Sequence, residues 1–159
     1  MDKAIYVKDK INPMNNKELP REAVDLINRG KTTIILATTD ENGHPRTAPF
    51  AWIYSPDPKT IRIAIYTQHD TYKNIQRNGW ATACILGENN IALSAKGRAR
   101  TIKEKLDCSP ITEAVVELNI TEVKSDVSAV GRVARGVEIS INEKFLETTQ
   151  KVFSELKSC

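Results

Sequence analysis

Residues 32–54 read TTIILATTDENGHPRTAPFAWIY, and this stretch decides the fold of the chain. Two runs rich in β-branched and aromatic residues, 32–39 and 46–54, flank the dipeptide Asn42-Gly43. Asn-Gly readily adopts the positive φ angles of a tight hairpin turn, so the pattern predicts an antiparallel β-hairpin here.

More extended runs follow the hairpin at short intervals. Two prolines in the polar cluster SPDPKT turn the chain into the run IRIAIYT. The later run IALSAKGRARTI alternates apolar or small residues with polar and basic ones, which predicts a half-buried strand with one basic face. In all, the sequence predicts six strands, over residues 32–39, 46–54, 61–67, 80–86, 91–102 and 113–126.

Three segments favour helices. Pro20 can open a helix and Gly30 can close it, and its buried stripe would consist of Ala23, Val24 and Ile27. A two-turn helix over residues 70–78 would be capped by Asp70 or Thr71. Residues 142–158 form an amphipathic terminal helix in this prediction, with the apolar positions Phe145, Leu146, Val152, Phe153 and Leu156.

The remaining segments are irregular. We expect residues 1–18 to be loosely ordered, and residues 127–141 fit either an edge strand or a loop around two glycines. Six short strands joined by tight turns, with only short helices between them, predict a mainly β, closed or nearly closed antiparallel barrel. The length and composition predict a single domain over residues 1–159.

Composition and motifs exclude several classes of function. No apolar run approaches the roughly 20 residues of a membrane span, and the start lacks a secretory signal pattern, so we expect a cytoplasmic protein. P-loop, GxSxG and HExxH motifs are missing, and His44 and His69 lack metal-ligand spacing, so no metal site is expected. The formal charge of +3 is too small to require nucleic acid as a partner.

One set of residues points to an anion. Arg46 opens a predicted strand, Thr67 ends the next one, and Thr71 and Lys73 begin the helix that follows. A guanidinium, an ammonium, hydroxyls and the amides of a helix N-terminus can together surround a phosphate group. The spacing therefore predicts a phosphate site between the two strands and the helix.

These motifs resemble those of the FMN-binding split barrel family related to pyridoxamine 5'-phosphate oxidase. The stretch RTAPFAW is similar to the family's arginine-bearing second strand, and SAKGRARTI to its glycine-bearing strand. Tyr66-Thr67, followed after three residues by Thr71-Tyr72-Lys73, is similar to the family's Tyr-Thr and Ser-Arg-Lys motif. The resemblance covers residues 19–104 and implies a six-stranded antiparallel split barrel of the Greek-key type with short flanking helices.

The resemblance also implies a role for individual residues. Arg46, Thr71 and Lys73 would hold the phosphate of FMN, and Thr67 would lie near the ribityl chain or the ring. The isoalloxazine ring would be lined by Tyr66 and by the backbone of Thr47, Ala48 and Pro49.

Three departures from the family pattern bear on function, and one of them is Ala92, which stands where the resemblance implies a glutamine offered to the flavin ring by the partner subunit. Tyr72 stands where the oxidase has a second arginine, so Lys96 or Arg98 is an alternative partner for the phosphate. The oxidase's C-terminal substrate segment has no counterpart, which argues against pyridoxamine 5'-phosphate as substrate. The resemblance thus implies an FMN-dependent oxidoreductase of unknown substrate and unassigned catalytic residues, with the flavin at the interface of a homodimer.

Three alternatives stay open. The chain could bind a flavin or a deazaflavin without turnover. It could bind nucleic acid through the basic strand SAKGRAR, although interleaved aromatic residues are missing there. His69 could tune the flavin ring or donate a proton to it, or it could simply be a loop histidine in solvent.

Overall fold

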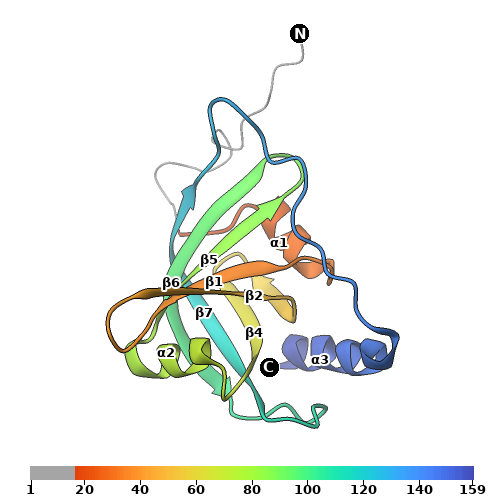
Figure 1. Cartoon of the computed structure of the whole chain (residues 1–159). Coiled ribbons are helices and arrows are strands. Elements are labelled where there is room, and N and C mark those ends of the chain that lie inside the picture. Colours follow the sequence, from red (N-terminus) through yellow and green to blue (C-terminus); the bar gives the residue numbers. More distant parts are fainter. Residues whose placement is uncertain (1–16) are drawn as a thin grey trace.

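The computed structural model describes residues 17–159 (Figure 1). Of the segment predicted to be loosely ordered, residues 1–18, the first sixteen lie outside the described residues. The strands are β1 (Ile34–Thr39), β2 (Pro45–Phe50), β3 (Ile53–Asp57), β4 (Thr60–Tyr66), β5 (Trp80–Gly87), β6 (Ile91–Lys103) and β7 (Glu113–Ser125). The helices are α1 (Arg21–Asn28), α2 (Asp70–Asn78) and α3 (Leu146–Ser158), and the 3-10 turn η2 (Glu143–Phe145) precedes α3.

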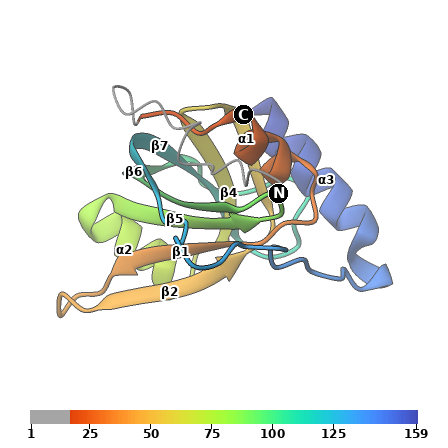
Figure 2. The ribbon, with the colours of Figure 1, turned by 90° about the horizontal axis from the view of Figure 1, so that it is seen from above.

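The strands form one antiparallel sheet in the order β2-β1-β5-β6-β7-β4-β3. β2 and β3 follow each other in the chain but lie at opposite edges of this sheet. Since only Ala51 and Trp52 join them, the sheet must coil until its two edges approach each other. Figure 2 shows the strongly twisted sheet from above, with the β1–β2 hairpin projecting beside α2.

The prediction of a mainly β, antiparallel fold with short helices is confirmed, but the prediction of six strands is wrong. The expected single strand over residues 46–54 is divided between β2 and β3, so the described residues contain seven strands. The division arises because the chain changes partner: β2 pairs with β1, whereas β3 pairs with β4. Between them the carbonyl of Trp52 accepts a hydrogen bond of 3.0 Å from the amide of Ala64 in β4.

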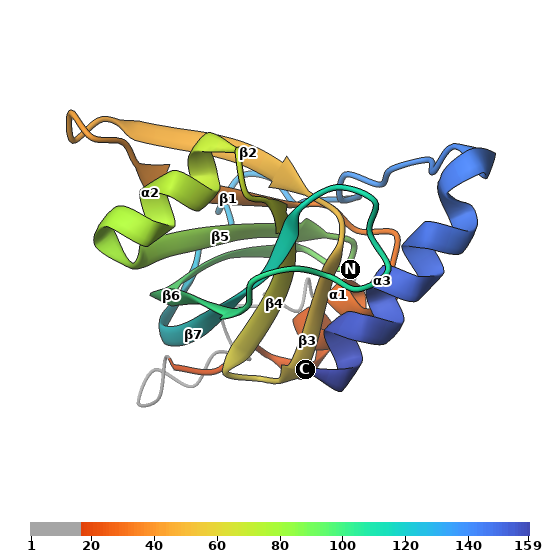
Figure 3. The same cartoon turned by 90° about the horizontal axis from the view of Figure 1, so that it is seen from below.

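The apolar core has two parts. The larger consists mainly of buried residues of β1 and β3 to β7, and α1 adds Ala23, Leu26 and Ile27 to it. Val24 is only partly buried, so Leu26 takes the place predicted for Val24. The smaller part lies where α3 runs beside β3 and β4 (Figure 3). There α3 buries Val152 and Leu156 fully and Phe153 partly. The predicted apolar stripe is too wide, because Phe145 and Leu146 are 54% and 48% exposed.

The cap of α2 differs from the prediction. Neither Asp70 nor Thr71 caps the helix; instead His69 Nδ1 accepts a hydrogen bond of 3.1 Å from the amide of Thr71. Gly79 ends the helix at a φ angle of 69°, a left-handed conformation that favours glycine.

Residues 127–141 contain no named strand. This segment runs as a loop that returns to the start of the sheet through one isolated bridge, Thr32 to Glu138. In the described part of the chain, no helix combines the length and the apolar character that crossing a membrane requires.

Candidate functional site

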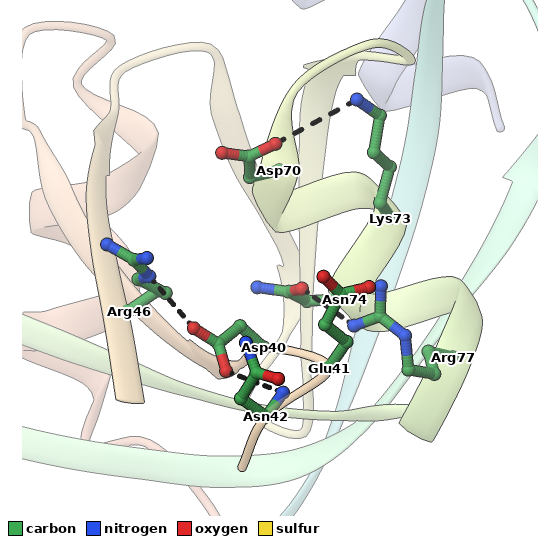
Figure 4. Close-up of a pocket in the computed structure, with 8 residues that line it drawn as sticks. All are labelled: Asp40, Glu41, Asn42, Arg46, Asp70, Lys73, Asn74 and Arg77. Atoms are coloured by element: carbon green, nitrogen blue, oxygen red, sulfur yellow. Dashed lines mark hydrogen bonds and ion pairs between the residues drawn. The ribbon is translucent and has the colours of Figure 1, made fainter. Parts of the chain in front are cut away.

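A cavity of about 260 Å³ lies between the β1–β2 hairpin and α2 (Figure 4). We call it the polar cavity, and its lining residues are Asp40, Glu41, Asn42, Arg46, Asp70, Lys73, Asn74 and Arg77. In Figure 4, β2 and the hairpin turn supply one wall and α2 supplies the other. The cavity thus brings together Arg46 and Lys73, two of the residues expected to hold a phosphate.

Polar contacts fix α2 against β1 and so determine the width of the polar cavity. Asn74 Nδ2 donates a hydrogen bond of 3.0 Å to Thr38 Oγ1, and both residues are buried. Near the end of the helix, Asn78 Nδ2 donates a bond of 3.3 Å to the carbonyl of Thr39. The exposed face of α2, which carries Lys73 and Arg77, is therefore held beside the hairpin.

Each cation of the polar cavity has a polar partner. Arg46 Nε lies 3.1 Å from Asp40 Oδ2, and Lys73 Nζ lies 3.8 Å from Asp70 Oδ1. Arg77 donates a hydrogen bond of 3.0 Å to Asn74 Oδ1. The Arg46 and Lys73 side chains are 68% and 51% exposed, so both cations stay accessible to solvent, although the Asp40 side chain is only 14% exposed. An incoming anion can therefore take these cations from their carboxylate partners.

The hairpin turn stabilises the charged form of Asp40. The pKa of this carboxyl is lowered, most of all by the hydrogen bond from the amide of His44. The amide of Asn42 and the Arg46 guanidinium lower the pKa further, whereas partial desolvation raises it. The carboxylate of Asp40 is thus part of the electrostatics that any ligand of Arg46 meets.

Some of the predicted residues do not line the polar cavity. Thr71 is only 3% exposed, on the buried face of α2. Thr67 Oγ1 donates a hydrogen bond of 3.1 Å to the carbonyl of Thr112. Tyr72 lies against β6, where its hydroxyl is 3.4 Å from Glu104 Oε2 and 3.3 Å from Thr101 Oγ1.

The alternative phosphate partners suggested by the sequence also lie elsewhere. Lys96 pairs with Glu122 at 2.7 Å, and the Arg98 guanidinium lies over the ring of Trp80, 4.3 Å from its centroid. The cation that the sequence interpretation missed is Arg77. Its position four residues after Lys73 places both side chains on one face of a helix, so the spacing could have revealed it.

A second cavity, of about 450 Å³, opens next to the polar one. Pro49 and Tyr66, two residues expected near a flavin ring, line it together with His69, Trp52 and Glu113. Most of its other lining residues are apolar, so we call it the apolar cavity: Phe50, Ala51, Ala64, Ile139, Ser140, Ile141, Asn142, Phe145 and Thr149.

The polar cavity and the apolar cavity adjoin each other both along β2 and at the start of α2. Arg46 and Pro49 are three residues apart on β2, and His69 directly precedes Asp70 at the start of α2. Between Arg46 and Pro49 lie exposed Thr47 and half-buried Ala48, which pair with Ala37 and Leu36 of β1. An elongated ligand with an anionic end and an apolar end can therefore lie along β2.

Comparison with known protein families shows to which family the chain belongs. The family model of pyridoxamine 5'-phosphate oxidase matches residues 19–135. The chain belongs to this family. The match includes β1 to β7, both walls of the polar cavity and all of the residues singled out by the motifs.

Solved structures support the same fold. A Lactobacillus delbrueckii protein described as a proposed pyridoxamine 5'-phosphate oxidase is 25% identical, with a TM-score of 0.60 over 70% of this chain and 97% of that one. HupZ of Group A Streptococcus is 21% identical, with a TM-score of 0.58 over 76% of this chain and 98% of its own.

An FMN-binding protein of Nostoc punctiforme related to pyridoxamine 5'-phosphate oxidase is 15% identical, with a TM-score of 0.51 over 64% of this chain and 78% of that one. At these identities the last two proteins bear on the fold alone. Comparison with curated protein sequences gave no match.

Proposed function

We propose that this member of the pyridoxamine 5'-phosphate oxidase family binds FMN, with the phosphate in the polar cavity. The observation that carries the proposal is the meeting of Arg46 from β2 with Lys73 and Arg77 from α2 on one solvent-open cavity. Guanidinium and ammonium groups are the side chains that recognise phosphate. The oxidase has a second arginine at the position of Tyr72, which carries no charge here. Arg77 would supply the third positive charge in its place.

The apolar cavity supports the rest of the flavin. From the phosphate, the ribityl chain would follow β2 past Thr47 and Ala48 toward Pro49 and Tyr66. The isoalloxazine ring would then lie at the mouth of the apolar cavity. A bound flavin supplies hydride chemistry, while this chain's residues bind the phosphate and orient the ring, so we propose an oxidoreductase.

We further propose that the flavin site is completed in a homodimer. β2 is an edge strand that pairs only with β1 in the described part of the chain, and four of its six residues are exposed. A second copy packed beside this edge would cover the open side of both cavities. Light scattering of the purified chain with and without FMN would test the assembly state.

The visible absorption spectrum of the purified chain, with the mass of any extracted cofactor, tests the flavin proposal. We expect the two absorption bands of a flavin and the mass of FMN. A deazaflavin mass would leave the phosphate site in place but change the cofactor. A colourless chain that binds neither added FMN nor a deazaflavin would contradict the proposal and favour the basic strand as a binding surface.

A further inference from the structure

We infer that the apolar cavity binds an organic cation, a compound with an apolar body and an ammonium group, through the carboxylate of Glu113. The inference deepens the proposed function and rests on it for the position of the cavity beside the flavin. The contacts that select the ligand belong to the cavity itself.

Glu113 is a buried carboxyl with one oxygen left to bind a ligand. It stands at the start of β7, is only 6% exposed, and lines the apolar cavity. Ser109 Oγ donates a hydrogen bond of 2.6 Å to Oε2, whereas Oε1 has no hydrogen-bond partner among residues 17–159. Among the described residues, the buried side-chain oxygens without a partner belong to Thr33 and Ser125, so Glu113 Oε1 keeps contact with solvent in the cavity, where an ammonium group can replace that water.

The hydrogen bond from Ser109 is typical of an ionised acceptor. Its length falls in the range of O–H···O⁻ bonds, and Ser109 Oγ also accepts a bond of 3.4 Å from the amide of Ile111. The serine proton is thus directed at Glu113. Burial has the larger effect and raises the pKa of Glu113 above its ordinary value, although the hydrogen bond from Ser109 lowers it in part. A cation in the cavity would stabilise the charged carboxylate further.

The rest of the lining suits a cation and disfavours an anion. None of the fourteen described lining residues is lysine or arginine. His69 Nδ1 accepts the amide proton of Thr71, so this ring nitrogen is engaged within α2 and does not donate a hydrogen bond to an anion in the cavity. The aromatic rings of Trp52, Tyr66 and Phe145 can offer their electron-rich faces to an ammonium group.

Trp52 gives the cavity its own spectroscopic probe. Its Nε1 donates a hydrogen bond of 3.3 Å to Thr149 Oγ1, which fixes the indole in the wall of the cavity. The other tryptophan, Trp80, does not line this cavity and stacks with Arg98 on another part of the sheet. Trp80→Phe therefore leaves a full-length chain whose tryptophan emission reports on the apolar cavity.

The test compares three probes of similar shape and different charge: benzylamine, benzyl alcohol and benzoate. Each is titrated into the full-length Trp80→Phe chain while Trp52 emission is recorded. We expect benzylamine to bind about tenfold more tightly than benzyl alcohol, and benzoate to bind most weakly. Equal affinities, or a preference for benzoate, would overturn the inference.

Two variants show whether Glu113 carries the preference. Glu113→Gln should lower benzylamine affinity to that of benzyl alcohol and leave benzyl alcohol unchanged. Glu104→Gln, which removes a carboxylate outside the cavity, should leave the affinities for benzylamine and for benzyl alcohol unchanged. Phe145→Lys adds a positive charge at a half-exposed lining position and should reverse the preference toward benzoate, so the inference stays testable if Glu113→Gln fails to fold. An unchanged benzylamine preference in folded Glu113→Gln or Phe145→Lys would contradict it.

A parallel FMN titration separates this inference from the proposed function. Binding of FMN without any preference for benzylamine would overturn the organic-cation site alone. A benzylamine preference in a chain that does not bind FMN would overturn the flavin proposal and leave the cavity as a separate binding site.

Discussion

Arg46 Nε lies 3.1 Å from Asp40 Oδ2, across the hairpin that forms one wall of the polar cavity. The other carboxylate oxygen of Asp40 accepts hydrogen bonds from the amides of Asn42 and His44, at 3.0 and 2.9 Å. Asp40 thus shapes the turn and also neutralises the guanidinium that we assign to the FMN phosphate. The cofactor must compete with Asp40 for Arg46.

The substitution Asp40→Asn tests this competition. The amide oxygen can still accept both turn hydrogen bonds, while the negative charge beside Arg46 is removed. We expect FMN to bind about two- to fivefold more tightly, an effect that added salt reduces. Titration of FMN fluorescence against both chains measures it. Unchanged or weaker binding in a variant of normal thermal stability would show that Asp40 does not oppose the ligand.

The three cations of the polar cavity should each contribute to FMN binding. Arg46→Ala, Lys73→Ala and Arg77→Ala should each weaken it by about 1.5 to 3 kcal/mol, the range for a hydrogen bond to a charged group. Lys96→Ala serves as the control, because Lys96 pairs with Glu122 outside the cavity. If all four variants bound FMN like the unmodified chain, the phosphate would not lie between β2 and α2.

Local signals in the sequence predicted the hairpin and α2 correctly. Asn42-Gly43 marks the position of the turn, and of the two residues Gly43 alone has a positive φ angle, 81°. The break at Ala51 and Trp52 could not be predicted in this way. Both halves of the run are extended, and they differ only in their partners, since β2 pairs with the preceding strand β1 and β3 with the following strand β4.

The site was predictable only in part, for similar reasons. Arg46 and Lys73 were recognised by motif, and Arg77 could have been recognised by its helical spacing. The capping role of His69 depends on the direction of one ring nitrogen, which no sequence pattern fixes. The apolar cavity was also missed, because Glu113 and residues 139–149 meet Trp52 only after the sheet has coiled.

Gly97 is required by a close approach of two strands. A Cβ atom there would lie 1.9 Å from the carbonyl oxygen of Asn119 in β7, at a register shift between β6 and β7. We expect Gly97→Ala to lower the free energy of unfolding by about 2 to 4 kcal/mol. Gly131→Ala is the matched control, since nothing lies within 4 Å of its Cβ position. Urea denaturation measures both, and similar stabilities for the two variants would rule out the steric conflict.

Glu155 links α3 to the connection between β6 and β7, and this link should make stability depend on pH. Its carboxylate accepts hydrogen bonds from the amides of Asp107 and Cys108, at 2.7 and 3.2 Å, and lies 2.6 Å from Lys103 Nζ. Burial alone would raise the pKa of Glu155, but Lys103 and the two amides lower it to about 2, against 4.5 for a free glutamate.

The pKa of Glu155 is lower in the folded chain than in the unfolded chain. The stabilisation from its carboxylate is therefore fully present above about pH 5 and is lost as the pH falls toward 2. Glu155→Gln should therefore be less stable than the unmodified chain by up to about 3 kcal/mol near neutral pH, and the gap should close in acid. Urea unfolding at a series of pH values measures the gap. Glu147→Gln, at an exposed site on the same helix, should show little effect. A gap that stays constant from neutral to acid pH would exclude an ionised Glu155 as its source.

The most direct measurement of the central claim is a titration of the unmodified chain with FMN and with riboflavin, which lacks the phosphate. If the phosphate lies between Arg46, Lys73 and Arg77, FMN should bind at least about a hundredfold more tightly than riboflavin. In Arg46→Ala that preference should shrink, because FMN affinity falls while riboflavin affinity stays the same. Equal binding of FMN and riboflavin by the unmodified chain would contradict the phosphate site.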